Sequence, residues 1–430
     1  MEHSFLIIFD DIPSIGTYDT VVIGGGLSGV AAAVAAAKEG MNTLLVDEKA
    51  ALGGTAGGAG IGLALGLADA DNENNIKGVL KDLIKRLWER SAAGPIETYY
   101  MCNREDLGVQ ALNYDPVALK EVLDDMAQDA GVHVLLHTRE IAAHVENGKI
   151  TAIALHNVAG ISQVSANVFI DASFHGSLAV DAGCRWESGD PNGVLQPGTL
   201  VYFTDGVDTK TFDEFSPEKR VELAGEGIAE GKLVVKNIIS RPLPNGVYQT
   251  NMGRVAVNPM DAFQWSEAER TGRRQSRNIS NFFHDRVPGF SESRMVGTAE
   301  FLGLRDSRRI MGKYILKGSD VLEGVKFPDA IARSSYPVDI HDTTGSSSVL
   351  KKPKTGEYFI PYRSLVANEV DNLLLAGRCI SADYEAHSAL RVMLTCLRIG
   401  EAAGTASAEC KRRNVTPAEV DGEALSKKLL

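Results

Sequence analysis

The chain contains few cysteines, and none of them stands at metal-binding spacing. Its 430 residues include five cysteines, and no two form a Cys-x-x-Cys pair. This pattern argues against a disulfide framework, a zinc site, an iron–sulfur cluster and a thioredoxin-like redox pair. The five thiols are expected to be reduced core residues, as in a cytoplasmic protein.

Positive charge and long apolar runs are also scarce. The sequence has 44 Lys and Arg against 56 Asp and Glu, a formal net charge of −12. Nucleic acid and anionic membranes require a basic surface, so neither is expected as a principal partner. No run is long enough to span a membrane. The apolar patch Phe5 to Phe9 is followed by Asp10 and Asp11, unlike a secretory signal. A small-molecule substrate is the partner expected, with a homo-oligomer left open.

Glycine, by contrast, is abundant, with 43 residues, and one short motif near the N-terminus is rich in it. The apolar run Val21 to Ile23 predicts a buried strand, and the alanine-rich run Leu27 to Glu39 predicts a helix. Between and within them, Gly24 allows a tight turn, Gly26 lets a pyrophosphate approach the backbone, and Gly29 lets the helix pack closely on the strand. The motif therefore predicts phosphate binding at a helix N-terminus.

A second strand and an acidic residue follow at the spacing of a dinucleotide-binding unit. Thr43 to Val46 predicts the strand, and Asp47 falls at its end, about 20 residues beyond the glycines, where a carboxylate hydrogen-bonds a ribose hydroxyl. Glu48 stands beside it as a substitute. The glycine-rich stretch from Gly53 to Gly62 either lets backbone amides approach a long cofactor or is a flexible loop. Taken as a unit, these elements predict a bound dinucleotide.

Further helices and strands are predicted downstream. Lys77 to Arg90 has apolar residues at helical spacing, and Asp115 with Pro116 opens a helix that ends near Ala130. The residues between, 101–113, look irregular. The dipeptide Asn147-Gly148 predicts a hairpin. The strands expected around it are 132–136, 141–145, 150–156 and 164–170.

From about residue 186 to residue 363 the alternation of strands and helices stops, and prolines and aromatics become more frequent. This change predicts a separate domain that faces the substrate. Two arginine groups in it are interpreted either as surface ion pairs or as a clamp for an anion of substrate or cofactor. If helical, the second group would share nearly one face. The groups are Arg270, Arg273, Arg274 and Arg277, and Arg305, Arg308 and Arg309.

Near the C-terminus, strand, glycine and helix recur. Asn372 to Ala376 predicts a strand, Gly377-Arg378-Cys379 follows it, and Leu390 to Ala406 predicts one long helix. A second helix N-terminus suits a flavoprotein, because it stabilises negative charge on a reduced flavin. Cys379 is interpreted as a buried inert thiol or, beside Arg378, as one with a lowered pKa. Residues 416–430 form a polar tail.

These blocks, in this order, resemble the FAD-dependent oxidoreductases of the glutathione-reductase-like superfamily, which are related in fold to fumarate reductase flavoproteins. The resemblance covers nearly the whole chain. It is carried by 24–29 with Asp47 and 53–56, 114–131, 169–172, 304–310, 336–341, 360–365, 372–378 and 386–391.

The resemblance implies an α/β fold with a Rossmann-type FAD-binding domain, built on a parallel sheet and a β-meander, plus an inserted α+β substrate domain. The FAD-binding domain is expected at 15–185 and 364–415, the substrate or cap domain at 186–363, and a tail at 416–430. The family places threonine, glycine and an acid after Asp171-Ala172, whereas this chain has Ser173-Phe174-His175. The implied FAD-binding residues are Gly24, Gly26, Leu27, Ser28, Gly29, Asp47, Glu48, Gly53, Gly54, Thr55, Ala56, Ile141, Ala172, Ser173, Gly377, Arg378 and Leu390.

Histidines are the natural source of a group that moves the proton beside a flavin. His387, just before the last long helix, is predicted as acid or base with Arg391 as its electrostatic partner, or else as a capping histidine. His341, between two acids, is second, or else forms a surface ion pair. His175 is a packing residue or a covalent flavin tether. Family position adds Tyr384, Tyr362 and Arg363 as pocket residues.

The predicted function is an FAD-dependent dehydrogenase or reductase. It transfers a hydride between flavin N5 and a small polar metabolite, a sugar derivative or an organic acid, with an unknown electron acceptor. The alternative is a flavin-bearing electron-transfer subunit of a larger complex. An RNA-modifying flavoprotein is disfavoured by the acidic charge balance.

Overall fold

The computed structural model describes residues 8–67, 76–343 and 348–430. The N-terminal apolar patch considered above lies largely outside the described residues. The fold is mixed α/β, and its largest sheet has the strand order β6-β2-β1-β9-β8-β7, with β20 also paired to β9. This sheet is mostly parallel on one side and a meander on the other, which confirms the predicted Rossmann-type class.

The parallel part of the sheet forms where the β-branched and leucine-rich runs predicted it. Strand β1 (Ser14–Ile23) pairs in parallel with β2 (Thr43–Val46) and with β9 (Gly160–Asp171). Strand β6 (His133–Leu135) extends the sheet beyond β2, and β20 (Leu373–Leu375) pairs in parallel with β9. The carboxyl ends of these strands therefore meet at one edge of the sheet, where α/β folds bind ligands.

The meander is the predicted hairpin and its return strand. Strands β7 (Arg139–Glu146) and β8 (Lys149–Asn157) are antiparallel and joined at Asn147-Gly148, and both turn residues have positive φ. Strand β8 then pairs antiparallel with β9. The hairpin prediction is thus confirmed, because Asn and Gly tolerate the left-handed conformation that a tight turn requires.

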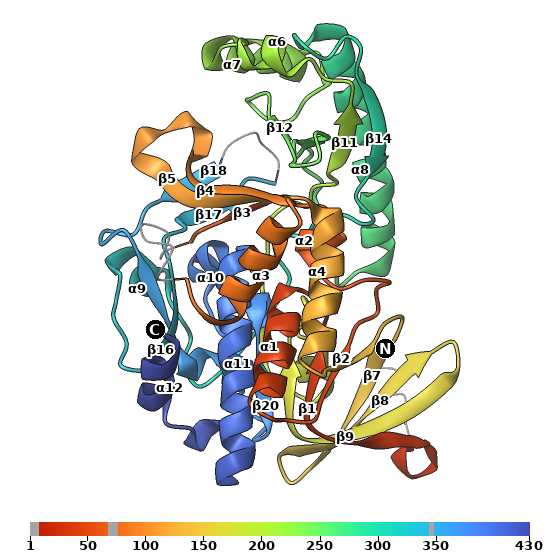
Figure 1. Ribbon diagram of the computed structural model, residues 1–430, viewed down its shortest axis with the longest axis vertical. Helices are drawn as coiled ribbons and strands as arrows, with labels where there is room; N and C mark the ends of the chain where they lie inside the picture. Colours follow the sequence, from red (N-terminus) through yellow and green to blue (C-terminus); the bar gives the residue numbers. More distant parts are fainter. Residues whose placement is uncertain (1–7, 68–75, 344–347) are drawn as a thin grey trace.

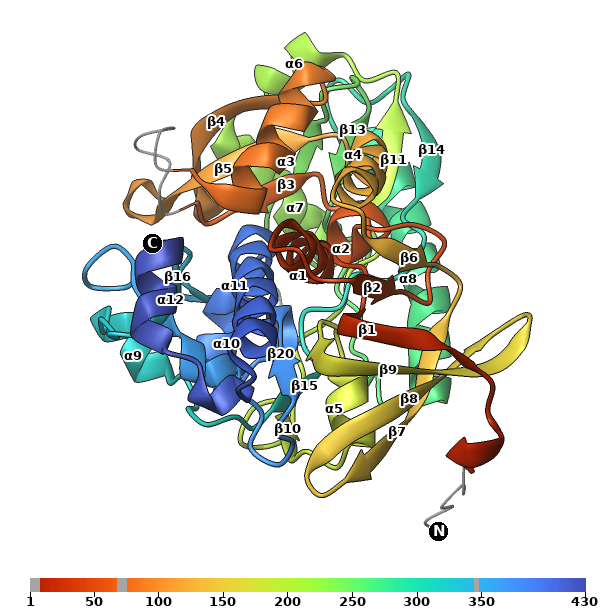
Figure 2. The ribbon, with the colours of Figure 1, turned by 60° about the horizontal axis from the view of Figure 1, so that its bottom comes forward.

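Two helices lie against each other over this sheet, as Figure 2 shows. Helix α1 (Leu27–Lys38) begins at the glycine turn, and α11 (Met393–Arg413) crosses it. A β-carbon placed on Gly400 would lie 1.9 Å from the carbonyl oxygen of Ser28, and one on Gly404 would lie 2.0 Å from that of Ala32. Glycine at both positions therefore lets the two backbones touch.

The remaining helices of the main body border this pair. Helix α3 (Gly78–Glu89) has the predicted apolar face, and α4 (Pro116–Asp129) begins after Asp115, whose side chain accepts from the amide of Val117. The short helices are α2 (Gly54–Gly57), α5 (Ser177–Asp181), α9 (Gly318–Glu323) and α12 (Gly422–Leu429). The C-terminal tail is therefore not free of structure, because α12 buries Leu425 in the main core.

A second group of elements lies at the far end of the molecule from the β7–β8 hairpin, as Figure 1 shows. It contains a four-stranded sheet of β12 (Ser240–Pro242), β13 (Tyr248–Thr250), β11 (Tyr202–Asp205) and β14 (Arg294–Thr298). Helices α6 (Thr209–Asp213), α7 (Pro217–Ala229) and the long α8 (Ala262–Arg286) accompany it. Buried residues from 200 to 304 form hydrophobic clusters separate from the main core. We call this group the cap.

The rest of the predicted domain 186–363 packs with the main body. Most of its buried apolar residues from Ile310 to Tyr362 belong to the same hydrophobic cluster as the large sheet. The strands of this part are β10 (Trp186–Ser188), β15 (Arg308–Ile310), β16 (Ala330–Ser334), β17 (Val338–His341), β18 (Ser348–Lys351) and β19 (Tyr358–Pro361). The predicted domain boundaries themselves stay a prediction.

Three local predictions are wrong. The predicted helix from Leu390 to Ala406 is two helices, α10 (Tyr384–Leu390) and α11, which a break at Arg391 and Val392 separates. Arg305, Arg308 and Arg309 do not lie on a helix, because 308–310 form strand β15. The irregular region 101–113 contains part of β5 (Gly108–Tyr114), which pairs with β3 (Leu63–Leu65) and β4 (Ala93–Tyr100).

Among the described residues, no helix combines the length and the apolar character that crossing a bilayer requires.

The contact between α1 and α11 makes a stability prediction. We expect Gly404→Ala to lower the free energy of unfolding by about 1–3 kcal/mol, because the added methyl group would enter the α1 backbone. The control is Gly225→Ala in α7, where no atom lies within 4 Å of the new β-carbon; alanine there should stabilise by about 0.5–1 kcal/mol through helix propensity. Urea midpoints of the two variants and the parent chain check both signs, and equal midpoints would contradict the close helix contact.

Candidate functional site

A long cavity runs along the carboxyl edge of the parallel strands. It is lined at one end by the end of β2 and the start of β7, in the middle by the β1–α1 turn, and at the other end by the start of α11. Its lining includes Gly24, Gly26, Leu27, Ser28, Asp47, Glu48, Gly53, Gly54, Thr55, Ala56, Ala172, Ser173, Arg378, Arg391 and Met393. We call this the first cavity.

The start of α1 is built to receive an anion. Gly26 is its N-cap residue and supplies no side-chain oxygen to the first-turn amides, which leaves backbone N–H groups directed at the cavity. A β-carbon on Gly26 would meet no atom within 4 Å, so the space beside it is open. These two features fit the diphosphate of a dinucleotide.

Gly24 and Gly29 allow the tight turn and the close backbone contact that lie behind that space. Gly24 has a φ of 105°, and a β-carbon on Gly29 would lie 1.7 Å from the carbonyl oxygen of Gly24. Gly29 therefore holds the helix against the turn and does not itself line the cavity, as the glycine motif predicts.

The carboxylate of Asp47, at the end of β2, accepts hydrogen bonds from two backbone amides. Asp47 accepts a short hydrogen bond from the amide of Gly25, and its other oxygen accepts from the amide of Lys49 at 2.7 Å. Burial raises the pKa of Asp47 despite these bonds. Glu48 also lines the cavity and forms an ion pair with Lys49 at 2.7 Å. Asp47 thus fixes the turn while both carboxylates face the expected ribose position.

The second glycine stretch lies directly against the first. The amide of Gly53 donates to the carbonyl of Gly25 at 2.8 Å, and a β-carbon on Gly54 would lie 3.0 Å from the α-carbon of Gly26. Residues 54–57 form the short helix α2 rather than a flexible loop. Thr55 and Ala56 continue the cavity wall from the diphosphate position.

Four implied FAD-binding residues are not part of this wall. Gly29, Gly377 and Leu390 do not line the cavity. Ile141 does not line it either, although the nearby residues Thr138 to Glu140 do. A β-carbon on Gly377 would lie 2.5 Å from the Ser28 hydroxyl, so this glycine serves packing. Further wall residues come from distant segments, and no local sequence pattern marks them: Lys49, Thr138, Glu140, Trp265, Phe301, Leu302 and Leu304.

His175 lines the first cavity. Its Nδ1 atom lies 2.8 Å from the Ser307 hydroxyl, and its ring contacts those of Phe174 and Trp265. Burial lowers its pKa to about 4, so the ring is neutral at pH 7. These contacts are those of a packed, hydrogen-bonded side chain that also faces the cofactor space.

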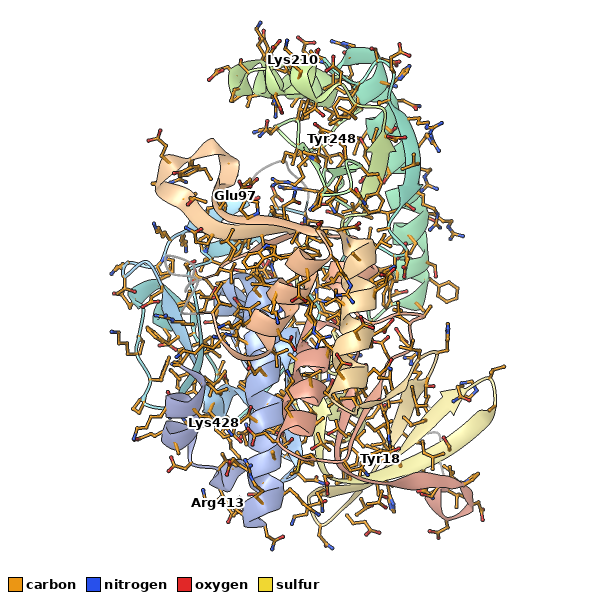
Figure 3. All side chains as sticks on the ribbon, in the orientation of Figure 1. Tyr18, Glu97, Lys210, Tyr248, Arg413 and Lys428 are labelled. Atoms are coloured by element: carbon orange, nitrogen blue, oxygen red, sulfur yellow. The ribbon has the colours of Figure 1, made fainter. Side chains whose placement is uncertain are left out.

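A second cavity of about 500 Å³ opens from the first and extends to the cap. The two share Thr55, Leu304, Arg378, Arg391 and Met393. The second cavity reaches from β17 and β18 to the β4–β5 hairpin and the cap sheet. Figure 3 marks the last two sides by Glu97 on β4 and Tyr248 on β13. This position, against one end of the first cavity, suits a substrate.

The second cavity is strongly positive although the chain is acidic. Among the described residues that line it, six carry a positive charge and one carries a carboxylate. The cations are Lys236, Arg241, Arg254, Arg305, Arg378 and Arg391, and the carboxylate is Asp339. Such a surplus in a partly desolvated space attracts anions.

Asp339 organises the deep end of this cavity. It is 3% exposed and accepts from the Tyr336 hydroxyl at 2.7 Å. It also lies 3.3 Å from both His341 Nε2 and Arg391 Nη2. Burial alone would raise the pKa of Asp339, but His341, Arg391 and Tyr336 outweigh burial and hold it well below the usual range.

His341 is in direct reach of this cavity. Its Nδ1 atom lies 2.7 Å from the Ser348 hydroxyl and 3.4 Å from Arg254 Nη2. Burial and the charge of Arg305 lower its pKa to about 4, against the opposite effect of Asp339. The imidazole is therefore neutral at pH 7 and ready to accept a proton.

Two arginines of this site are held by neutral oxygens. Arg305 donates to the carbonyl of Pro197 at 2.7 Å and to the Thr199 hydroxyl at 2.9 Å. Arg378 donates to the carbonyl of Leu304 at 2.8 Å. Burial lowers the pKa of both guanidinium groups. Within the described part of the chain, neither forms a salt bridge, so an anionic ligand would supply the missing charge.

The structure does not bring His387 to either cavity, and this corrects its predicted role. His387 is 1% exposed, lies inside α10, and leaves its Nδ1 atom without a partner. Arg391, its predicted partner, does line both cavities. Tyr384, Tyr362 and Arg363 line neither. Cys379 is buried, and burial raises its thiol pKa well above the ordinary value, so the inert interpretation holds.

The open space beside Gly26 makes a binding prediction. We expect Gly26→Val to abolish binding of FAD, because its side chain would occupy the space that a diphosphate needs without touching the protein. Gly225→Val on α7, where an added β-carbon also meets no atom within 4 Å, is the control for folding. Titration of FAD into the apoprotein, followed by flavin fluorescence, measures this. Stoichiometric FAD in the Gly26 variant would contradict the placement of the diphosphate.

Comparison with solved structures places the fold among flavoproteins. The geranylgeranyl bacteriochlorophyll reductase-like protein of Thermoplasma acidophilum matches 96% of this chain and 83% of its own length, with a TM-score of 0.51 and 16% identity. The p-nitrophenol 4-monooxygenase of Pseudomonas putida matches 96% and 84%, with a TM-score of 0.51 and 12% identity. A flavin-dependent brominase matches 96% and 83%, with a TM-score of 0.52 and 12% identity. At these identities the likeness shows the fold.

The sequence comparisons give the family. An uncharacterized protein of the nifH2 5' region of Methanosarcina barkeri is 27% identical over 168 residues, which are 38% of this chain and 85% of that protein. The family model described as "FAD dependent oxidoreductase" matches residues 19–429. With the dinucleotide cavity at the start of α1 and a family match over nearly its whole length, this chain belongs to the FAD-dependent oxidoreductase family and has FAD as its cofactor.

Proposed function

We propose that this enzyme oxidises or reduces a small organic acid, which binds as an anion in the second cavity. The observation that carries the proposal is the charge of that cavity, with six cationic side chains against one carboxylate in a chain of net charge −12. An organic acid supplies the counter-charge that this cavity lacks. A neutral sugar derivative, the other predicted substrate class, would leave the guanidinium groups unmatched.

The cofactor supplies hydride transfer at flavin N5 when bound. The residues that would hold it line the first cavity, with the α1 turn for the diphosphate and Gly53 to Ala56 for the continuation. Arg305 and Arg254 would orient the substrate carboxylate, and Arg305 is already fixed by Pro197 and Thr199. A guanidinium held in place binds a carboxylate in a defined geometry, which positions the reacting carbon.

His341 is the group that would move the proton. It is neutral, lines the cavity, and is oriented by Asp339 on one side and Ser348 on the other. Bound substrate anion would offset the charge of Arg305, which now opposes protonation of the ring. Substrate binding would thereby make His341 a better proton acceptor at the moment when one is needed.

The alternative, a flavin-bearing electron-transfer subunit, would need no such cavity. The second cavity shares five wall residues with the first, which gives a substrate direct access to the expected flavin end. The shared wall and the clustered cations favour substrate chemistry in this chain. The electron acceptor stays open.

Anaerobic reduction of the flavin tests the proposal. In the absence of nicotinamide cofactors, FAD-loaded protein is mixed with a panel of hydroxy acids, amino acids and sugars, and the loss of flavin absorbance is followed. To test the reverse direction, chemically reduced protein is mixed with unsaturated acids. We expect a reaction with an acid, and Arg305→Gln should raise the half-saturating concentration on the order of 100-fold, because a charge-assisted contact is lost. Arg277→Gln, on the exposed face of α8, is the control. Reaction with neutral sugars alone, or equal behaviour of both variants, would refute the proposal.

The proton role of His341 makes a separate prediction. We expect His341→Gln to slow flavin reduction at saturating substrate on the order of 100-fold, with FAD binding unchanged. In the parent enzyme, kcat/KM should be flat from roughly pH 5 to 8, because a base with a pKa lowered to about 4 stays neutral as the pH falls through that range. His156→Gln, at an exposed position of β8, is the control. An acidic limb near 6.5, the ordinary value, would contradict this assignment.

A further inference from the structure

The mouth of the second cavity carries a polar group that the proposed chemistry does not use. Lys236 and Asn237 precede β12, Arg241 lies within β12, and Asn251 follows β13. All four line the cavity. They belong to the cap, on other segments than Arg305, Asp339 and His341, which line the deep part of the same cavity.

These four side chains lack hydrogen-bond and ion-pair partners in the described part of the chain. Among the described residues, Lys236 and Arg241 form no salt bridge, and the side-chain amides of Asn237 and Asn251 form no hydrogen bond. The amide oxygens of both asparagines are buried without a partner. Several arginines elsewhere on the cap are paired with acids, as Arg286 is with Glu226 and Glu230. Unpaired cations and unsatisfied amides around one space indicate a place for a polar ligand group.

Arg241 is held in position although no acid pairs with it. Its guanidinium lies 4.7 Å from the ring centroid of Tyr99 on β4, and Arg241 is fixed in β12 by its register opposite Gln249. Gln249 in turn donates to the carbonyl of Gly60. A cation positioned in this way is ready to meet an anion without first giving up another partner.

Much of the remaining cavity wall is apolar. It comes from β3, the β4–β5 hairpin, the cap and β18, and comprises Ile61, Leu63, Leu65, Tyr99, Met101, Val235, Ile239 and Leu350. A charged group would be poorly solvated along this wall, whereas hydrocarbon or an aromatic ring would bury apolar surface there. The cavity therefore combines two sets of cationic side chains with an apolar wall.

We propose that Lys236, Asn237, Arg241 and Asn251 form a second anion subsite, and that the substrate is elongated. It carries one carboxylate at the deep end, an apolar middle, and a second anionic group, a carboxylate or a phosphate, at the mouth. This inference rests on the proposed function, because it adds a second contact to the organic acid placed at Arg305.

Binding of matched ligand pairs tests the inference directly. FAD-loaded protein is titrated with saturated dicarboxylates of increasing chain length and with monocarboxylates of the same lengths, and flavin absorbance and calorimetry report binding. Dicarboxylates that reach both subsites should bind about tenfold or more tightly than their monocarboxylate partners, since a second charge-assisted contact forms. A third series with a phosphonate at the far end shows which anionic group the mouth prefers.

Variants separate the two subsites. Lys236→Gln with Arg241→Gln should remove the advantage of the dianions over monocarboxylates of the same length. Arg305→Gln should weaken both ligand classes. Lys232→Gln with Arg277→Gln, which removes the same charges from surface positions outside the cavity, is the matched control and should change neither.

The outcomes distinguish the inference from the proposed function. If monocarboxylates bind in an Arg305-dependent way but dianions of every length bind no more tightly, the organic-acid site stands and the second subsite is refuted. The inference also falls if the control variant loses the dianion advantage equally, because long-range charge then explains it. If no carboxylate binds in an Arg305-dependent way, the proposed function itself is refuted.

Discussion

The backbone contact between α1 and α11 is the constraint on which both cavities depend. Gly400 and Gly404 allow α11 to touch the carbonyls of Ser28 and Ala32, and no larger residue fits there. Because α1 begins at the first cavity and α11 begins at Met393, which lines both cavities, this contact brings the two helix starts together. The anion-binding turn of α1 and the cationic residues near α11 therefore share one wall, although some 360 residues separate Leu27 from Met393. The close packing of the two helices therefore holds the proposed substrate cavity beside the dinucleotide cavity.

The parts of this structure that sequence predicts are those that short-range patterns determine. The β1–α1 turn, the position of Asp47, the Asn147-Gly148 hairpin and the cap of α4 at Asp115 each follow from a few adjacent residues whose backbone preferences are strong. The break between α10 and α11 was missed, because Arg391 and Val392 carry no helix-stopping residue and tertiary contacts decide their conformation. The wall residues Trp265 and Phe301 were missed for a similar reason, since they reach the cofactor space from separate segments of the cap region.

The electrostatics of the second cavity show why its charge could not be found from composition. The chain as a whole is acidic, yet the cations of the cavity come from five segments distant in the sequence and gather at one place. Burying a guanidinium such as that of Arg305 or Arg378 without a carboxylate costs free energy, which neutral oxygens offset only in part. An anionic ligand removes this cost, so the same arrangement that weakens the free protein favours binding. The free-energy cost of these buried, unpaired guanidinium groups in the free protein therefore supports a ligand of negative charge.

The two histidines illustrate which sequence signal was informative. His387 was favoured because it precedes a helix and stands one turn before Arg391, but a residue inside α10 can face the core as readily as the cavity, and it does face the core. Asp339 and His341 stand two residues apart on β17, and alternate residues of a strand point to the same face. An acid and a histidine at this spacing therefore share one face of a strand, and here the two side chains lie 3.3 Å apart. The pattern Asp-x-His, combined with the strand propensity of the segment around Val338 and Ile340, contained the information that the position of His387 lacked.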